Sequence, residues 1–240
     1  MLSRVAMGAV YVAGSVNMDV VVAAPRYPKI GETIAGREIG FFPGGKGANQ
    51  AVAAARLGVS AALIARVGAD AFGRDLRTFL KAQQIDLDRL RETPQAATGT
   101  AQITVVDGSN TIIVVAGANA MLGEADVGAV PFAAGDVAVS QFEIPAATVR
   151  AFFTQARAKG ARTILNPAPA GPIDGELMRL TDVLILNETE LSLLAGQEID
   201  AASPPPISLG RLARCAPARI RRSALRWGRA ARLRSSATRP

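Results

Sequence analysis

The 240-residue sequence contains no histidine and a single cysteine, Cys215. Without histidine, the chain cannot carry a Ser-His-Asp triad, a Cys-His pair or a histidine-ligated zinc ion. One cysteine cannot form a disulfide within the chain, so a reducing cytoplasm is the expected location. Aromatic residues make up only 5% of the sequence, but apolar residues reach 49%, which is enough for a substantial buried core.

Long apolar runs are absent as well. No stretch of 18 apolar residues occurs, so no membrane-spanning segment is expected. The apolar residues near the N-terminus follow one arginine and loosely resemble a signal peptide. A first buried strand is the favoured interpretation, because the polar residues Asn17 and Asp19 follow it at once.

Lysine and acidic residues are missing from the last 40 positions. Residues 1–200 carry 17 Lys and Arg against 20 Asp and Glu, a net charge of −3, whereas residues 201–240 carry 10 Arg and no acid, a net charge of +10. The proline-rich start of this segment indicates a linker, and we expect the remainder to be disordered. A frameshift after about residue 200 is the favoured origin of this composition. The alternatives are a basic tail that binds nucleic acid or acidic membranes, and a different ending of the fold.

Apolar runs alternate with helical patterns over residues 8–200. The expected strands are 10–15, 20–24, 33–42, 60–67, 99–106, 111–116, 136–141, 162–166 and 182–186, and the expected helices are 45–57, 71–84, 145–159, 188–195 and a short one before 182. This alternation predicts an α/β fold with a mostly parallel sheet. The strands at 20–42 and the hairpin at 99–115 do not fit the alternation, so they would form a small β lid beside the sheet.

Asn17 and Asp19 follow the first strand directly. With one residue between them, their side chains would share a face if the chain stays extended. An amide beside a carboxylate offers both donors and acceptors, which suits the hydroxyl groups of a polyol. The alternative is a turn, because turns favour both residue types.

A glycine-rich segment at 42–51 begins a helix. Its glycines would let backbone N–H groups approach a ligand at the helix N-terminus. Lys46 adds a charge, and Asn49 adds an amide one turn further along. The spacing is not that of a Walker A loop, so the segment alone is weak evidence for a phosphate site.

Taken in order, these segments resemble the ribokinase family, the PfkB-type carbohydrate kinases. The matching pieces are Gly14-Ser15-Val16-Asn17-Met18-Asp19, Gly44-Gly45-Lys46-Gly47-Ala48-Asn49-Gln50-Ala51, Val67-Gly68-Ala69-Asp70-Ala71-Phe72-Gly73, Thr98-Gly99-Thr100-Ala101, Asn166-Pro167-Ala168-Pro169-Ala170 and Asn187-Glu188-Thr189-Glu190. The resemblance implies one incomplete domain over residues 1–200. Its fold would be doubly wound, with helices on both faces of the sheet, a small β lid and no C-terminal part.

The resemblance also implies roles for individual residues. Those that would bind the sugar are Asn17, Asp19, Gly45, Lys46, Gly47, Asn49 and Glu143. By itself, Glu143 is a charge at the start of a helix. Asn187 would lie near the nucleotide phosphates, and Glu190 would organise Mg²⁺ through water molecules. The same two residues fit a helix capping box, and both interpretations can hold together.

The activity implied is transfer of the ATP γ-phosphoryl group to the primary hydroxyl of ribose, which gives ribose 5-phosphate. The lid would exclude water and would pair with a second lid in a homodimer. The family's Gly-Ala-Gly-Asp segment, which provides the anion hole and the catalytic aspartate base, does not occur in the sequence.

Without that segment no catalytic residue is assigned, and we expect impaired turnover. The family's monovalent-cation site is also not expected in this chain. The alternative functions are a non-catalytic sugar-binding protein and a kinase for another sugar or nucleoside. A nucleic-acid binder acting through the basic tail is less favoured.

Overall fold

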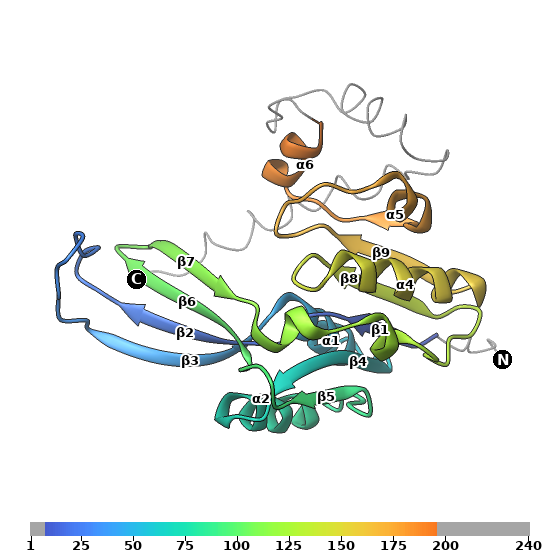
Figure 1. Ribbon diagram of the computed structural model, residues 1–240, viewed down its shortest axis with the longest axis horizontal. Helices are drawn as coiled ribbons and strands as arrows, with labels where there is room; N and C mark the ends of the chain where they lie inside the picture. Colours follow the sequence, from blue (N-terminus) through green and yellow to red (C-terminus); the bar gives the residue numbers. More distant parts are fainter. Residues whose placement is uncertain (1–7, 196–240) are drawn as a thin grey trace, which may run out of the picture.

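The computed structural model describes residues 8–195 (Figure 1). At its centre is a six-stranded sheet in the order β10-β9-β8-β1-β4-β5, in which neighbouring strands are parallel. The strands are β1 (Val10–Ala13), β4 (Ala61–Gly68), β5 (Leu90–Thr93), β8 (Val137–Gln141), β9 (Arg162–Asn166) and β10 (Val183–Leu184). Because the chain builds outward in both directions from β1, the predicted doubly wound, mostly parallel fold is confirmed.

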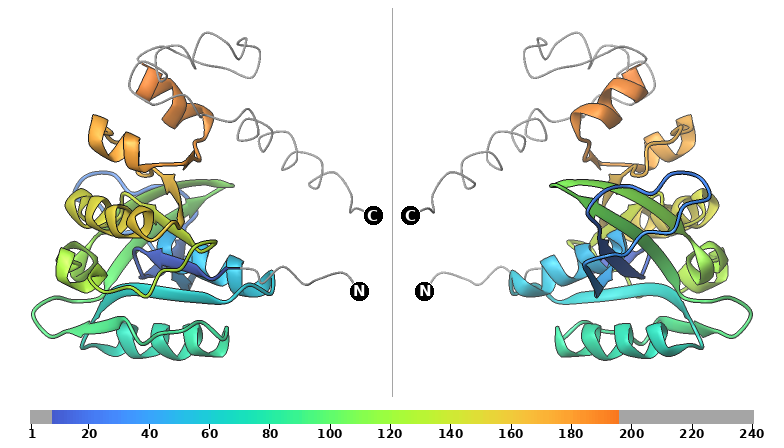
Figure 2. Two further views of the ribbon diagram at one scale, coloured as in Figure 1. Left: turned by 90° about the vertical axis from the view of Figure 1, so that its right-hand side faces the viewer. Right: turned by 90° about the vertical axis from the view of Figure 1, so that its left-hand side faces the viewer.

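Helices cover both faces of this sheet, as Figure 2 shows for the light-blue α1 and the yellow α4. The helices are α1 (Lys46–Arg56), α2 (Ala71–Ala82), α3 (Glu124–Val127), α4 (Ala146–Ala158), α5 (Gly175–Leu180) and α6 (Glu188–Ala195), with a 3₁₀ turn η1 (Gly117–Met121). Val12 packs in the core that includes α1 and α2, and its neighbour Ala13 packs against α4. Successive strand residues point to opposite faces, so both faces of the sheet are buried.

A second sheet of four strands extends away from the first (Figure 1). Its order is β3-β2-β6-β7, and its strands are β2 (Asn17–Ala23), β3 (Glu38–Gly44), β6 (Gly99–Val106) and β7 (Ser109–Val115). β6 and β7 form a hairpin whose two turn residues, Asp107 and Gly108, have φ values of 45° and 80°. Positive φ at both turn positions matches the right-handed twist of the flanking strands. We call this second sheet the outer sheet.

The strand limits differ most from the predictions at two places. The strand expected at 33–42 begins only at Glu38, because the preceding residues form a loop in which Arg26 pairs with Glu32. The strand expected at 20–24 begins at Asn17, since β2 pairs with both β3 and β6 from that residue onward. The alternative that Asn17 and Asp19 form a turn is therefore wrong.

Three short elements were not predicted: β5, η1 and α3. Each has five residues or fewer, which is too short for a hydrophobic period to be recognised. Among residues 8–195, no helix has the length and apolar character needed to cross a membrane. The linker and the arginine-rich extension expected at 201–240 lie outside the described residues.

Candidate functional site

Asn17 and Asp19 lie on β2, where the outer sheet joins the central one. Asn17 is 3% exposed, and its Oδ1 accepts a hydrogen bond of 2.7 Å from Nδ2 of Asn119. Within the described chain, neither Nδ2 of Asn17 nor the carboxylate of Asp19 has a hydrogen-bond partner. Burial raises the pKa of Asp19, and the negative charge of Glu143 raises it further. Both side chains therefore keep polar atoms available for a ligand.

The start of α1 packs tightly against the β1–β2 connection. Gly45 has a φ of +88°, and a Cβ atom there would lie 2.8 Å from the backbone nitrogen of Asn17. A Cβ atom on Gly47 would lie 2.6 Å from backbone atoms of Gly14 and Ser15. The glycines thus allow the helix to approach the strand connection closely.

The first N–H groups of α1 are already bonded within the protein. The N–H of Lys46 donates to Glu143 Oε2 at 3.0 Å, the N–H of Gly47 donates to Ser15 Oγ at 3.2 Å, and that of Ala48 donates to the Ser15 carbonyl at 2.9 Å. The expectation that these groups meet a ligand directly is therefore wrong. The helix N-terminus acts instead by holding a carboxylate.

That carboxylate belongs to Glu143, which follows β8. Its Oε2 also accepts a hydrogen bond of 2.5 Å from Ser15 Oγ, and Ser15 is fully buried. A negative charge at a helix N-terminus is favourable, so the charge of Glu143 stabilises the start of α1 rather than the helix that follows it in sequence. Its other oxygen, Oε1, has no donor in the described part of the chain.

The structure brings together most of the residues that the sequence analysis expected to bind the sugar. Asn17, Asp19, Gly45, Lys46 and Glu143 form one cluster at the junction of the two sheets. Gly47 supports this cluster through its contact with Ser15, and Asn49 lies exposed on the first turn of α1. No described carboxylate lies within 4 Å of the Lys46 ammonium group. We refer to the cluster of Asn17, Asp19, Gly45, Lys46 and Glu143 as the junction site.

Asn119 in η1 belongs to the junction site but was not selected from the sequence. It is 1% exposed and bonds both to Asn17 and to the backbone of Val16. The signal that could have identified it is weak, because a polar residue in a short Gly-Ala-Asn segment after a strand is typical of an ordinary turn.

Asn187 and Glu190 lie at the start of α6, beyond β8 and β9 (Figure 1). Glu190 accepts from the backbone and side-chain nitrogens of Asn187, both at 3.0 Å, and Oδ1 of Asn187 accepts from the Glu190 N–H at 2.7 Å. This is the predicted capping box. No described contact joins the pair to the junction site.

A magnesium ion fits Glu190 only through water. Residues 8–195 contain no group of three or more Cys, Asp or Glu side chains arranged to hold a metal ion. Each carboxylate oxygen of Glu190 accepts one hydrogen bond from Asn187 and so retains one lone pair for a water molecule. Mg²⁺ commonly keeps several of its waters, which is compatible with such an indirect contact.

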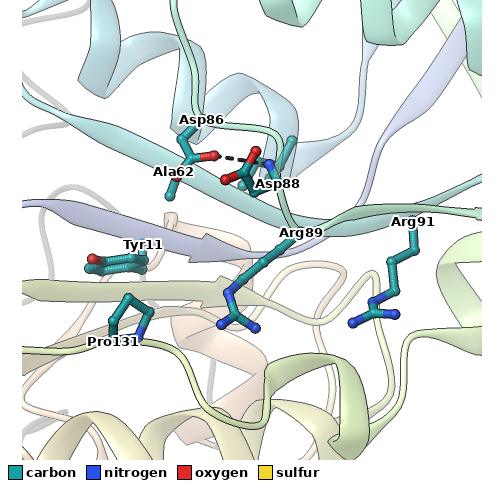
Figure 3. A pocket seen from close by; sticks show the side chains of 8 residues that line it. Tyr11, Ala62, Asp86, Asp88, Arg89, Arg91 and Pro131 are labelled. Carbon is teal, nitrogen blue, oxygen red and sulfur yellow. Dashed lines mark hydrogen bonds between the residues drawn. The ribbon is translucent and has the colours of Figure 1, made fainter.

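A cavity of about 350 Å³ lies at the opposite end of the strands, near the starts of β1, β4 and β5 (Figure 3). The polar side chains around it are Tyr11, Asp86, Asp88, Arg89 and Arg91. Arg89 donates to the carbonyl oxygens of Gly128 and Ala129, and Arg91 lies 3.4 Å from Asp126. Arg89 thus contacts the segment that follows α3 and Arg91 contacts α3 itself, and the cavity is separate from the junction site.

Comparison with known proteins relates the chain to sugar kinases. The profile described as pfkB family carbohydrate kinase matches residues 7–205. The chain is 43% identical over 196 residues to ribokinase of Mus musculus, covering 80% of this chain and 60% of the mouse protein. It is 39% identical over 191 residues to ribokinase of Haemophilus influenzae, covering 78% of this chain and 62% of that protein.

Solved structures agree with these sequence matches. The structure of Arabidopsis thaliana ribokinase complexed with ribose and ATP matches with a TM-score of 0.77 and 30% identity, covering 88% of this chain and 70% of that one. A ribokinase from Thermotoga maritima matches with a TM-score of 0.75 and 29% identity, covering 87% of this chain and 69% of that one. The chain spans about 60% of the length of the curated relatives it matches.

Proposed function

Because the chain belongs to the pfkB family of carbohydrate kinases, we propose that its junction site binds the sugar acceptor of an ATP-dependent kinase, with ribose as the acceptor. The observation that carries this proposal is the carboxylate of Asp19. It is partly buried, it lies near a second carboxylate, and it has no donor within residues 8–195. Such an arrangement is costly for a folded chain, so it points to a ligand that supplies the missing hydrogen bonds.

The chemistry of the site matches a polyol. Asp19 and Oε1 of Glu143 accept hydrogen bonds from hydroxyl groups, and Nδ2 of Asn17 donates to a hydroxyl oxygen. Lys46 adds a positive charge at the start of α1, and because no described carboxylate pairs with its ammonium group, that group can donate to a sugar hydroxyl. The outer sheet would act as a lid that excludes water, which otherwise competes with the sugar as acceptor of the phosphoryl group.

ATP supplies the γ-phosphoryl group that is transferred to the primary hydroxyl, giving ribose 5-phosphate. We assign Asn187 to the neighbourhood of the nucleotide phosphates and Glu190 to a water-mediated contact with Mg²⁺. No Gly-Ala-Gly-Asp segment occurs in the sequence, so no residue is assigned as the base. For these 240 residues taken alone, the proposal is therefore sugar binding with impaired turnover.

A second copy of the chain is the proposed partner of the outer sheet, and the cytoplasm is the proposed location. Strand register places Phe42, Val114 and Ile112 on the same face as Asp19. All three apolar side chains are more than half exposed. An exposed apolar face that continues from the ligand site suits pairing of two outer sheets.

The proposal is tested by titrating ribose into the purified 240-residue chain in a calorimeter, with fructose and adenosine as competing candidates. Ribose should bind most tightly. The D19N variant should lose binding by about tenfold or more, since the loss of one charged hydrogen bond costs about 1.5–3 kcal/mol.

The matched control is D75N, which changes an exposed aspartate on α2 and should bind ribose like the wild type. Preference for fructose or adenosine would identify a different acceptor. Absence of binding by every sugar would contradict the proposal. Steady ADP release that depends on ribose would show that the chain is a complete catalyst.

A further inference from the structure

We propose that Asn119 is a positioning residue that fixes which end of the Asn17 amide faces the ligand. In this arrangement the NH₂ group of Asn17, and not its oxygen, is presented to the bound molecule. The inference rests on the proposed role of the junction site in binding a sugar. It adds to that role a further residue, Asn119, and a fixed orientation of the Asn17 amide.

The orientation of the Asn119 amide follows from the backbone of Val16. The N–H of Val16 donates to Oδ1 of Asn119 at 2.9 Å, and the carbonyl of Val16 accepts from Nδ2 at 3.3 Å. A backbone N–H can only donate and a backbone carbonyl can only accept. The oxygen and the nitrogen of Asn119 therefore cannot exchange places.

The fixed Asn119 amide in turn fixes Asn17. Its remaining proton is donated to Oδ1 of Asn17 at 2.7 Å, so the Asn17 oxygen is occupied and its NH₂ group points elsewhere. That NH₂ group has no acceptor in the described part of the chain. The direction of the Val16 backbone N–H and C=O groups thus sets, through the buried Asn119 and Asn17 amides, which group faces the ligand.

Gly99 at the start of β6 lies directly against the contact between the Asn17 and Asn119 amides. A Cβ atom there would lie 2.2 Å from Nδ2 of Asn119 and 2.4 Å from Oδ1 of Asn17. Any side chain larger than hydrogen would displace the bonded pair of amides. The contact between the Asn17 and Asn119 amides therefore requires a glycine at position 99.

This polarity gives the site a directional pattern. Asp19 can only accept hydrogen bonds when it is ionised, and the exposed end of Asn17 can only donate. Asn17 and Asp19 are separated by one residue on β2. A ligand that satisfies both must offer a donor and an acceptor side by side, as neighbouring hydroxyl groups of a pentose do.

The first experiment needs no ligand. Solvent exchange of side-chain NH₂ protons is measured by NMR on the ¹⁵N-labelled chain. Exchange at Asn119 should be at least about tenfold slower than at Asn17, because both side chains are buried but only the NH₂ group of Asn119 is bonded to acceptors of the described chain. The reverse order, or equal rates, would overturn the proposal whether or not the chain binds a sugar.

The N119D variant then tests the relay, by which we mean that the orientation of the Asn119 amide sets the orientation of the Asn17 amide. Aspartate keeps the acceptor for the Val16 N–H but replaces the donor with an oxygen, so the Asn17 amide should rotate to donate to it and its protons should become protected. N110D, which changes an exposed asparagine on β7 of the outer sheet, is the matched control and should leave Asn17 unchanged. Unaltered exchange at Asn17 in a folded N119D chain would refute the relay. If N119D does not fold, the wild-type exchange rates still decide.

Ligand selectivity provides the functional readout. Ribose, 2-deoxyribose and 3-deoxyribose are titrated into the wild type and N119D. The wild type should bind ribose more tightly than at least one deoxy sugar. In N119D the ratio of these two affinities should fall about tenfold, because one hydrogen bond to the sugar is lost. Equal weakening of all three sugars would assign Asn119 a purely structural role. No binding by the wild type would contradict the proposed function, leaving the NMR result to decide the relay.

Discussion

Asp19, which we propose to bind the sugar, and Ser15, which bonds only to protein groups, show two different uses of single residues at the junction site. Asp19 has a raised pKa, caused first by burial and then by Glu143, so its ionised form is unfavourable in the folded chain. Ser15 is fully buried and serves only other protein groups, donating to Glu143 and accepting from Gly47. Functional sites commonly retain such unfavourable groups at a cost in stability.

The D19N variant should be more stable than the wild type at neutral pH. The folded chain binds a proton at Asp19 more tightly than the unfolded chain, so stability is lost as pH rises from the ordinary pKa of aspartate through the raised value. Removing the charge abolishes this loss. We expect thermal unfolding to occur a few degrees higher for D19N at pH 7, and the two midpoints to converge below the ordinary pKa. A lower midpoint for D19N at pH 7 would contradict this account.

The S15A variant should weaken both folding and sugar binding. Loss of the hydroxyl leaves the Gly47 N–H without its acceptor and removes one of two donors from Oε2 of Glu143. A buried group left unpaired costs about 1–3 kcal/mol. Urea unfolding should show a loss of that size, and calorimetry a weaker affinity for ribose. S109A, at an exposed position of the outer sheet, serves as control and should match the wild type in both measurements.

At the scale of elements, periodicity was sufficient for the long helices and the central strands. The predicted helices at 45–57, 71–84 and 145–159 correspond to α1, α2 and α4. The short elements were not found because their positions depend on tertiary contacts. α3, for example, is anchored by Asp126, which receives two hydrogen bonds of 2.8 Å from Arg66 on β4. No local pattern reveals such a partner 60 residues away.

Asp126 should therefore contribute strongly to stability. Burial opposes its ionisation, yet hydrogen bonds from Arg66 and Gly123 hold its pKa below the ordinary value. D126A leaves Arg66 without its carboxylate and should cost about 1–3 kcal/mol in urea unfolding at pH 7. E124A, at an exposed position of the same helix, should cost much less.

The pH dependence provides a second check on Asp126. Its stabilising effect is present above the ordinary pKa of aspartate and is lost as pH falls through the lowered value. The difference between D126A and the wild type should therefore shrink at strongly acidic pH. A difference that stays constant from pH 7 down to that range would rule out the ion pair as its cause.

For the whole molecule, the alternation of strand and helix patterns was enough to predict a mostly parallel α/β fold, and the resemblance to the ribokinase family added the doubly wound arrangement. The residues by themselves predicted the junction site only as separate motifs, since Asn17, Lys46 and Glu143 come from three distant segments, and the family resemblance joined them into one site. Their hydrogen bonds depend on how α1 approaches the strand connection. The sequence indicated a helix N-terminus open to a ligand, whereas Ser15 and Glu143 occupy its N–H groups.

Pairing of outer sheets is the prediction at this scale. I112K places a charge on the apolar face that also carries Asp19, so it should convert a dimer into a monomer in sedimentation velocity. L57K, at an exposed position after α1 in the central body, should leave the dimer intact. A wild-type chain that sediments as a monomer at high concentration would contradict the proposed pairing.

The location of Asn17 and Asp19 on β2 has a mechanical consequence. Two of the side chains proposed to bind the sugar belong to the outer sheet, whereas Lys46 and Glu143 belong to the central body. A sugar held by all four would bridge the two bodies and fix the angle between them. Sugar affinity would then depend on the equilibrium between orientations of the outer sheet relative to the central body. A substitution that stiffens the connection between the two bodies should therefore alter sugar affinity even though the substituted residue does not contact the sugar.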